Sequence, residues 1–303
     1  MCLIAFAINA SARWPLVIAA NRDEFLNRPT LPLARWQGPA RQDIISGRDL
    51  RAGGTWLGMN PNGRVAFLTN VREGQALLAP RSRGELVTRW LEASGDADAF
   101  AQSLSKDAAS YGGFNLIVGD FQHQAWTWLT NKPAGQATAA ASPLQSQPLA
   151  PGVYGLSNAS LNTPWPKTTA LKEALALALH KPEEKALQAS LWAALGNRER
   201  ARPEQLPLTG VPLALEQALS SAFVDYPEHG YGTRSSTLLL VSEPGHSEGA
   251  RRWEVSVEER SYGQTPRPDT TETAAAAVHG AQVSGIHRER FSWQPLTEAV
   301  KAS

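Results

Sequence analysis

Short apolar runs rich in β-branched and aromatic residues recur along the chain and are separated by turn-forming residues. Runs of this kind are typical of β-strands. They predict strands at 3–8, 16–20, 64–68, 114–119, 124–129, 236–242 and 252–258. Longer stretches with helical periodicity lie at 82–94, 97–105, 166–180, 183–195 and 212–222. In the third of these, Leu171, Leu175 and Leu179 recur at every fourth residue, which places them on one face of a helix.

The order of these elements favours antiparallel sheets flanked by helices. The predicted strands come in neighbouring pairs, the helices then come in pairs, and strands return near the end of the chain. The pattern differs from the regular alternation of strand and helix that marks a parallel sheet. We therefore expect an α+β fold in which helices cover the outer faces of packed sheets.

Segments of small and polar residues indicate where the domain ends. Residues 133–151 are rich in Ala, Gln, Ser and Pro, which predicts a surface loop. The segment from Thr265 to about Gly285 is rich in Pro, Thr and Ala, which predicts a flexible tail. We expect one domain over residues 1–262, followed by a partly flexible C-terminal extension over residues 263–303.

Composition and charge narrow the class of protein. The chain has 303 residues, of which 42% are apolar and 19% charged, and its formal net charge is +1. This balance offers no basic face for nucleic acid. The apolar run at 3–8 is too short to span a bilayer and lacks the cationic flank of a secretory signal. We expect a cytoplasmic protein without stable membrane insertion, and the oligomeric state is left open.

The single cysteine, Cys2, directly follows the initiator methionine. One cysteine can form neither an internal disulfide nor a paired-cysteine metal site, so its reactivity is the main question. A small second residue permits removal of Met1, which gives Cys2 a free α-amine beside its thiol. An α-amine has a reference pKa of about 7.7–8.0, so it can accept the thiol proton near neutral pH. Cys2 is therefore predicted to be an N-terminal nucleophile that carries its own base.

A hairpin between the first two predicted strands would give Cys2 a cationic neighbour. A turn centred on Ala12 pairs residues whose numbers sum to 24, so Cys2 lies opposite Arg22. Cross-strand Cβ atoms lie about 4.5–5.5 Å apart, which is close enough for a guanidinium to lower the pKa of the thiol. A slip of one residue would place a neighbour of Arg22 there instead. The carboxylates of Asp23 and Glu24 are expected to orient the amine and hold the arginine.

Acyl transfer also needs hydrogen-bond donors aimed at the developing oxyanion. Asn70 and Asn158 each follow a strand-like run, where such donors can lie. Arg234 precedes two serines and is suited to bidentate capture of a carboxylate. Each residue also has a structural interpretation, because strand-end asparagines cap turns and Arg234 can pair with Asp23 or Glu24. The sequence leaves these alternatives open.

Eight short motifs occur in order between residue 1 and about residue 262. They are Met1-Cys2-Leu3, Asn21-Arg22-Asp23-Glu24, Gly53-Gly54-Thr55-Trp56-Leu57-Gly58, Thr69-Asn70-Val71-Arg72, Ser82-Arg83-Gly84, Phe114-Asn115-Leu116, Leu156-Ser157-Asn158 and Gly232-Thr233-Arg234-Ser235-Ser236-Thr237. Together they resemble the NRDE family, the family of transport and Golgi organisation protein 2. The resemblance implies an N-terminal nucleophile (Ntn) hydrolase fold, a four-layer αββα sandwich, for residues 1–262. It also implies a role either in moving haem or in lipid or acyl-coenzyme A metabolism.

A more distant similarity is to the cysteine Ntn amidases that cleave bile salts and penicillin V. That group uses a nucleophile, an arginine, an aspartate, two asparagines and a late arginine. In the same order this chain has Cys2, Arg22, Asp23, Asn70, Asn158 and Arg234. The spacing between the arginine and the aspartate differs here. The similarity implies hydrolysis of an amide or thioester of a small or lipid-like molecule, with no cofactor.

Two alternatives to hydrolysis stand beside this interpretation. In the first, the same pocket carries haem as cargo, and binding would be non-covalent because the chain has no Cys-x-x-Cys-His motif. In the second, Cys2 is a small residue buried in a core strand. The six histidines lack the spacing of a metal site on one helix, so no metal is expected.

Overall fold

A computed structural model describes residues 2–72, 79–132, 144–243, 252–263 and 282–293. In this part of the chain the strands form two antiparallel sheets of seven strands each. Sheet A has the order β10-β1-β2-β12-β13-β14, with the short β11 also paired to β12. Its strands are β1 (Cys2–Ile8), β2 (Leu16–Phe25), β10 (Gly152–Leu156), β11 (Asp225–Tyr226), β12 (Tyr231–Ser242), β13 (Trp253–Gly263) and β14 (Gln282–Trp293).

Sheet B runs in sequence order from β3 to β9. Its strands are β3 (Thr30–Gln37), β4 (Asp43–Asp49), β5 (Leu57–Met59), β6 (Arg64–Asn70), β7 (Phe114–Asp120), β8 (Ala125–Thr130) and β9 (Gln145–Pro148). The α-helices are α1 (Gly84–Glu92), α2 (Ala97–Ser105), α3 (Pro166–Ala178), α4 (Glu184–Leu195) and α5 (Leu213–Ala218). Every helix and strand predicted from the apolar pattern is present, with ends that differ by a few residues.

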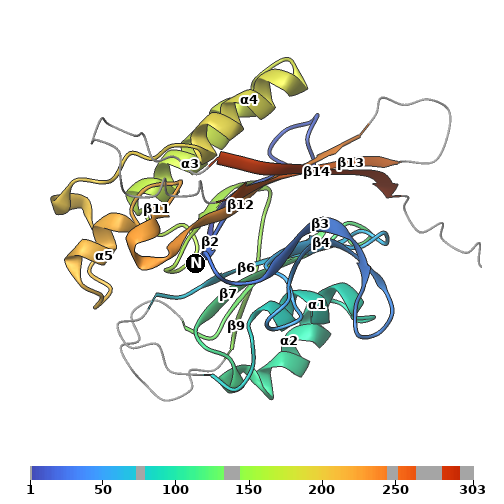
Figure 1. Ribbon diagram of the computed structural model, residues 1–303. Coiled ribbons are helices and arrows are strands. Elements are labelled where there is room, and N and C mark those ends of the chain that lie inside the picture. The colour runs from blue at the N-terminus through green and yellow to red at the C-terminus, as the bar shows by residue number, and fades with distance from the viewer. Residues whose placement is uncertain (1, 73–78, 133–143, 244–251, 264–281, 294–303) are drawn as a thin grey trace, which may run out of the picture.

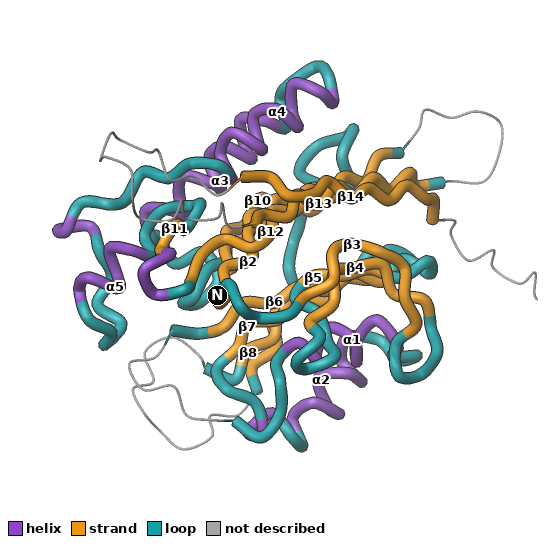
Figure 2. The backbone as a smooth tube through the Cα atoms, viewed as in Figure 1, coloured by secondary structure: helices purple, strands orange, loops and turns teal. Residues whose placement is uncertain are grey.

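The two sheets lie face to face between two layers of helices (Figure 1). Helices α3 and α4 cover the outer face of sheet A, and α1 and α2 cover the outer face of sheet B. The same four layers are visible in the tube view, where strands form the centre and helices the two outer sides (Figure 2). The predicted α+β class and the αββα layer order are confirmed.

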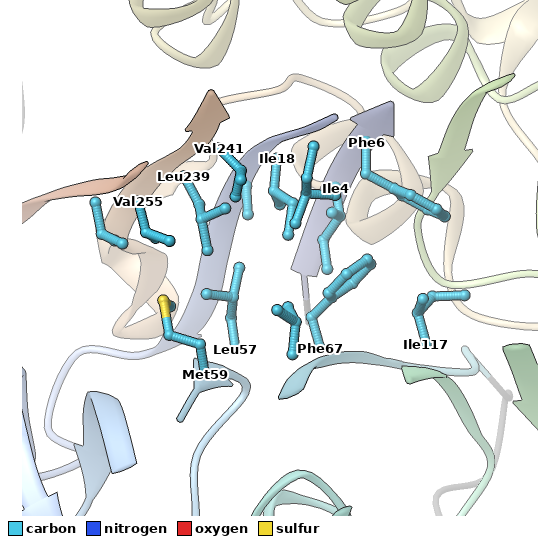
Figure 3. Packing of buried hydrophobic residues seen from close by; sticks show 14 of the residues in the cluster. Ile4, Phe6, Ile18, Leu57, Met59, Phe67, Ile117, Leu239, Val241 and Val255 are labelled. Carbon is cyan, nitrogen blue, oxygen red and sulfur yellow. The ribbon is translucent and has the colours of Figure 1, made fainter. Parts of the chain in front are cut away.

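Strand β1 shows how the sequence builds the middle of this sandwich. All seven of its residues are buried, because one face meets sheet B and the other meets the helices. Ile4 and Phe6 belong to the core between the sheets, whereas Leu3 and Ala5 pack against α3 and α4. Figure 3 shows Ile4 and Phe6 opposite Phe67 of sheet B, and the two phenylalanine rings are 4.9 Å apart. A strand that is buried on both faces has a continuous run of apolar residues in its sequence, and β1 has such a run.

The predicted hairpin register is confirmed, because β1 and β2 pair Cys2 with Arg22. Strand β2 continues five residues beyond the predicted end at residue 20, reaching Phe25. It does so because β12 pairs with it along this length and matches Ser235 to Arg22. The tetrapeptide at 21–24 therefore lies within the sheet.

Two segments differ from the sequence prediction. Residues 145–148, predicted as part of a surface loop, form the edge strand β9, whose residues are exposed. Residues 282–293 form β14, which pairs with β13 along its length. Trp293 is fully buried, and its indole N–H donates to the carbonyl of Asn60 at 2.8 Å. Sheet A therefore extends past the boundary predicted at residue 262.

Other parts of the predicted surface loop and of the predicted C-terminal extension lie outside the described residues. These are 133–143 in the loop, and 264–281 and 294–303 in the C-terminal extension. Among the described residues, no helix has both the length and the apolar character needed to cross a membrane.

Candidate active site around Cys2

Cys2 begins β1 and points into the space between the sheets, at the edge of the core that Ile4 and Phe6 continue. Its side chain is 7% exposed. Arg22 and Ser235 follow it across the sheet on neighbouring strands. Asn158 lies on its other side, two residues after Leu156, which pairs with Ile4. Asn158, Cys2, Arg22 and Ser235 thus lie in one row across sheet A, with the thiol between Asn158 and Arg22.

Arg22 is held in place from several directions. Its guanidinium lies 3.7 Å from the Glu24 carboxylate and 3.8 Å from that of Asp49, and it sits 4.3 Å from the centre of the Trp56 ring. The side chain is 5% exposed. Its Nη1 is buried and has no hydrogen-bond partner among the described residues. Arg22 therefore retains a buried donor close to Cys2.

Burial raises the pKa of the Cys2 thiol, and this effect outweighs the amino terminus and Arg22, which lower it. The carboxylates of Asp23 and Glu24 raise it further. The expectation that Arg22 brings the thiol pKa down is therefore corrected: the arginine acts in that direction, but desolvation is the larger effect. The thiol is protonated at rest, so attack on a carbonyl requires a base.

Asp23 approaches Cys2 from the opposite face of sheet A. Because neighbouring residues of a strand alternate in direction, Arg22 faces the thiol and Asp23 faces the helices. In the hairpin register Asp23 directly follows Arg22, the partner of Cys2, so it lies at the amino end of β1. Its carboxylate accepts a hydrogen bond from the Thr233 hydroxyl at 2.8 Å. Burial raises the pKa of Asp23, and Lys167 and the amino terminus oppose this.

The two predicted oxyanion donors lie together. The Asn158 side-chain amide donates to the backbone carbonyl of Asn70 at 2.9 Å, which links the end of β10 to the end of β6. The Ser157 hydroxyl lies 3.4 Å from the Cys2 carbonyl and 3.3 Å from the Asn158 side-chain oxygen. Asn70 takes part in this bond through its backbone carbonyl, and its side chain forms no hydrogen bond between described residues. Asn158 already uses one donor structurally.

Arg234 interacts electrostatically with two charged residues of this group, Arg22 and Glu24. It falls in an irregularity between Thr233 and Ser235, where the pairing with β2 shifts by one residue. Its guanidinium donates to backbone carbonyls at and just after the end of β2, including that of Phe25 at 3.1 Å. Among the described residues it forms no ion pair with the carboxylates near Cys2. Arg234 holds the end of β2 and the chain after it in place, which agrees with a structural role, and its expected role in capturing a substrate carboxylate stays a prediction.

Lys167 is a neighbour of this site that the sequence prediction missed. It lies in the first turn of α3 and is 5% exposed, and its ammonium donates to the carbonyl of Leu219 at 2.8 Å. Burial lowers its pKa to about 8, and the charges of Asp23 and Cys2 oppose this. One signal was present in the sequence: a cation in the first turn of a helix is disfavoured by the helix dipole. Such a lysine needs an anion nearby.

Glu259 of β13 is a second missed residue, on the thiol side of sheet A. It is 2% exposed, and its carboxylate accepts the backbone N–H of Leu33 at 2.8 Å. That N–H is available because the pairing of β3 with β4 is interrupted between Leu31 and Ala34. Burial raises the pKa of Glu259 to about 7, and the Leu33 N–H and Arg22 oppose this. Glu259 connects the two sheets next to the arginine.

We expect Glu259 to make the stability of the protein depend on pH. Folded Glu259 keeps its proton up to about pH 7, whereas the unfolded carboxyl loses it near 4.5. The folded state binds more protons between these values, so this residue lowers the free energy of unfolding as pH rises from about 4.5 to about 7. The change is about 3 kcal/mol.

Urea unfolding of Glu259→Gln at pH 5 and pH 8 measures this effect. Glutamine can still accept the Leu33 N–H, so the variant should lose about 3 kcal/mol less than the wild type between the two pH values. Glu254→Gln changes a carboxylate on the same strand that is 43% exposed, and should behave like wild type. Equal pH dependence in wild type and Glu259→Gln would contradict the assignment.

Two surface hollows lie away from this site. One surrounds the turn between β1 and β2, at Asn9 to Ala12 and Pro15. The other lies between β10 and α3, at residues that include Val153 and Lys172. Neither includes Cys2.

Comparison with known proteins places the chain in a family. The family model described as Transport and Golgi organisation 2 matches residues 1–253. The chain belongs to this family. The match begins before Cys2 and includes every site residue predicted from the sequence. The region that matches the Transport and Golgi organisation 2 family model therefore contains both the β1–β2 hairpin and the late strand β12.

Individual relatives match along most of their length. The Transport and Golgi organization protein 2 homolog of Bos taurus is 32% identical over 282 residues, which cover 86% of this chain and 98% of the relative. The homolog of Homo sapiens is 34% identical over 260 residues, covering 81% and 90%. Transport and Golgi organization protein 2 of Drosophila melanogaster is 27% identical over 257 residues, covering 80% and 88%.

Two solved structures were compared with this member of the Transport and Golgi organisation 2 family. A Caenorhabditis elegans ortholog of N-acylethanolamine-hydrolyzing acid amidase has a TM-score of 0.43 and 14% identity, covering 63% of this chain and 85% of that chain. A mutant of conjugated bile acid hydrolase from Clostridium perfringens has a TM-score of 0.42 and 8% identity, covering 96% of both chains.

Proposed function

We propose that this protein is a cysteine hydrolase of the Ntn type that cleaves an amide or thioester bond in a small or lipid-like molecule. The observation that carries the proposal is the position of Cys2 at the first residue of β1, between Arg22 on one face of the sheet and Asp23 on the other. The thiol and the α-amine of one residue would then each have a charged neighbour of its own.

The proposed reaction begins once Met1 has been removed. The α-amine of Cys2 takes the thiol proton, and the sulfur attacks the carbonyl carbon of the substrate. The oxygen of that carbonyl gains the negative charge, which the Asn70 amide stabilises with help from Asn158. The tetrahedral intermediate expels an amine or thiol, which takes the proton from the ammonium. Water, activated by the same amine, then hydrolyses the acyl-enzyme and releases a carboxylic acid.

The raised thiol pKa makes a base necessary for this sequence of steps. A thiol that is protonated at rest gains nothing from Arg22 until a base removes its proton, and the α-amine is covalently attached to the same residue. The Nη1 donor of Arg22, which has no hydrogen-bond partner among the described residues, can then stabilise the thiolate as it forms. Asp23 is placed to accept a hydrogen bond from the amine and so orient its lone pair.

The proposal is tested with a panel of short-chain acyl thioesters, nitrophenyl esters and anilides. Small donors are appropriate because Cys2 is only 7% exposed. We expect a rapid release of leaving group, equal to the enzyme concentration, followed by slower turnover, since an acyl-enzyme accumulates when its hydrolysis is slow. A protein with Met1 removed and Cys2 intact that releases no leaving group from any member would overturn the proposal.

Cargo binding is the competing outcome, and haem is the ligand to test for it. A spectroscopic titration of haem into wild type and Cys2→Ala distinguishes the two functions. If both proteins bind haem equally and the wild type transfers no acyl group, the protein transports haem and is not a hydrolase. Acyl transfer that depends on Cys2 would favour the hydrolase.

A further inference from the structure

Lys167 lies beneath the amino end of β1, on the helix side of sheet A. Its ammonium binds the Leu219 carbonyl, which begins a segment running to Val224 below the sheet. The same segment is fixed at its other end by Thr233, whose hydroxyl accepts the N–H of Val224 at 2.9 Å while donating to Asp23. Lys167 and Asp23 are therefore attached to opposite ends of one short, buried stretch of chain.

Four ionisable side chains on the surrounding elements interact electrostatically with the Lys167 ammonium. They are Asp23 of β2, Arg72 after β6, the Cys2 thiol of β1 and Glu216 of α5. Arg72 and Glu216 form a buried ion pair with each other, and their side chains are 4% and 2% exposed. That pair is neutral as a unit, so Asp23 is the anion that remains for Lys167.

Removal of Met1 adds a second candidate cation for the same carboxylate. The α-amine of Cys2 would lie beside Asp23 in the hairpin register, where two ammonium groups and one carboxylate would leave a net buried charge. An uncompensated buried charge is costly, so one of the two groups gives up its proton more readily. The reference pKa of an α-amine is about 7.7–8.0, and Lys167, with its pKa lowered to about 8, keeps the Leu219 carbonyl as a hydrogen-bond acceptor for its charged form. Because that acceptor stabilises the ammonium of Lys167, the α-amine is the group that loses its proton.

We propose that Lys167 is a positioning residue that acts through Asp23 to keep the α-amine of Cys2 unprotonated near neutral pH. Asp23 then accepts a hydrogen bond from a neutral amine, whose lone pair is free to take the thiol proton. The inference rests on the proposed function, because it assigns a task to the base of that reaction. Lys167 need not touch the substrate.

The charge state of Lys167 is compatible with this task. Burial lowers its pKa to about 8, so the ammonium remains mostly charged at pH 7. Its hydrogen bond to Leu219 fixes the charge in one place. A fixed positive charge in a buried site disfavours a second one nearby, which is the condition for a neutral amine at this pH.

The experiment measures the protonation of the α-amine directly. Cys2→Ala is used as the background so that the thiol does not compete for the reagent. A trace of acetic anhydride is added between pH 5 and pH 9, and acetylation of the N-terminal peptide is followed by mass spectrometry. Lys167→Gln removes the charge and keeps a donor for Leu219. We expect its amine to be acetylated about fivefold more slowly at pH 7, with the midpoint of the pH dependence displaced upward.

Two further variants separate charge from structure. Lys167→Arg keeps the charge and should restore the wild-type pH dependence. Lys172→Gln alters an exposed lysine of the same helix, which contacts the Asn162 side chain at 3.0 Å, and should have no effect. Lys167→Met is the second neutral variant if the glutamine variant does not fold. In the proteins that retain Cys2, the acidic limb of kcat/KM should move in the same direction as the acetylation midpoint.

An unchanged acetylation midpoint in the neutral variants would overturn the role of Lys167. Failure of the proposed function would show itself differently. In that case the midpoint would still move in the Cys2→Ala background, while wild type formed no acyl-enzyme with any donor.

Discussion

Replacement of Cys2 by alanine is expected to abolish acyl transfer, lowering turnover of any reactive thioester or ester by at least about a thousandfold. Alanine retains the α-amine, Asp23 and Arg22 but has no atom that can form the acyl-enzyme. Stability should fall by only about 1 kcal/mol, because the substitution removes a single sulfur atom from a buried position. The measurement is steady-state hydrolysis together with thermal unfolding of the same preparation.

Cys2→Ser is the matched control for this substitution. The hydroxyl occupies the same place, but its proton is harder to remove, so we expect activity between those of wild type and Cys2→Ala. Hydrolysis at the wild-type rate by Cys2→Ala would mean that another residue is the nucleophile and that Cys2 has only a structural role in the core.

Asp23→Asn is expected to lower kcat/KM by about two to four orders of magnitude, the range associated with general acid–base catalysis. The amide has the same shape and can still accept a hydrogen bond from Thr233, so the local structure should be retained. The variant removes the charge that orients the α-amine and compensates Lys167. Hydrolysis measured from pH 5 to pH 9 tests this loss of rate.

Glu24→Gln is the neighbouring control. Glu24 lies next to Asp23 in the sequence, but its carboxylate interacts with Arg22 and Arg28 at 3.7 and 3.6 Å. Asp49 also contacts both arginines, so loss of Glu24 leaves them a carboxylate partner. We expect less than about a tenfold loss of rate for Glu24→Gln. Equal losses in the two variants would mean that Asp23 has no special relation to the amine.

The sequence was most informative where contacts are local. A short hairpin has few registers, so the pairing of Cys2 with Arg22 could be predicted by counting from its turn. The alternation of strand side chains then separates Arg22 from Asp23, although they are adjacent in the chain. The length of β2 could not be predicted in the same way, because its last residues are held by β12, more than two hundred residues later.

Lys167 and Glu259 were missed because their environments come from distant segments. Lys167 appears in the sequence as one lysine on an amphipathic helix, and only the approach of Leu219 and Asp23 makes it a buried cation. Glu259 belongs to a strand that alternates polar and apolar residues, and its burial depends on contact with β3 of the other sheet. Neither distant contact can be identified from the element that carries the residue, although the place of Lys167 in the first turn of α3 indicates that an anion lies nearby.

The contacts of Arg234 could not be predicted for a similar reason. The motif around Arg234 fixes its place along the chain, but a shift of one residue in the β2–β12 pairing changes the direction of its side chain. Such irregularities are set by the packing of whole strands, and β-bulges redirect the side chains they contain. Strand β14 was missed because it follows a stretch rich in Pro, Thr and Ala, although Trp293 at its end is buried in the core.

The central claim is that Cys2 acts as an N-terminal nucleophile, and intact-mass analysis during turnover tests it most directly. Purified wild-type protein is mixed with a short-chain acyl thioester, quenched in acid within the burst, and examined whole and after digestion. We predict a protein without Met1 that carries one acyl group on the Cys2 sulfur, and Cys2→Ala should carry none. Full turnover by a protein that retains Met1, or an acyl group located on any other residue, would contradict the claim.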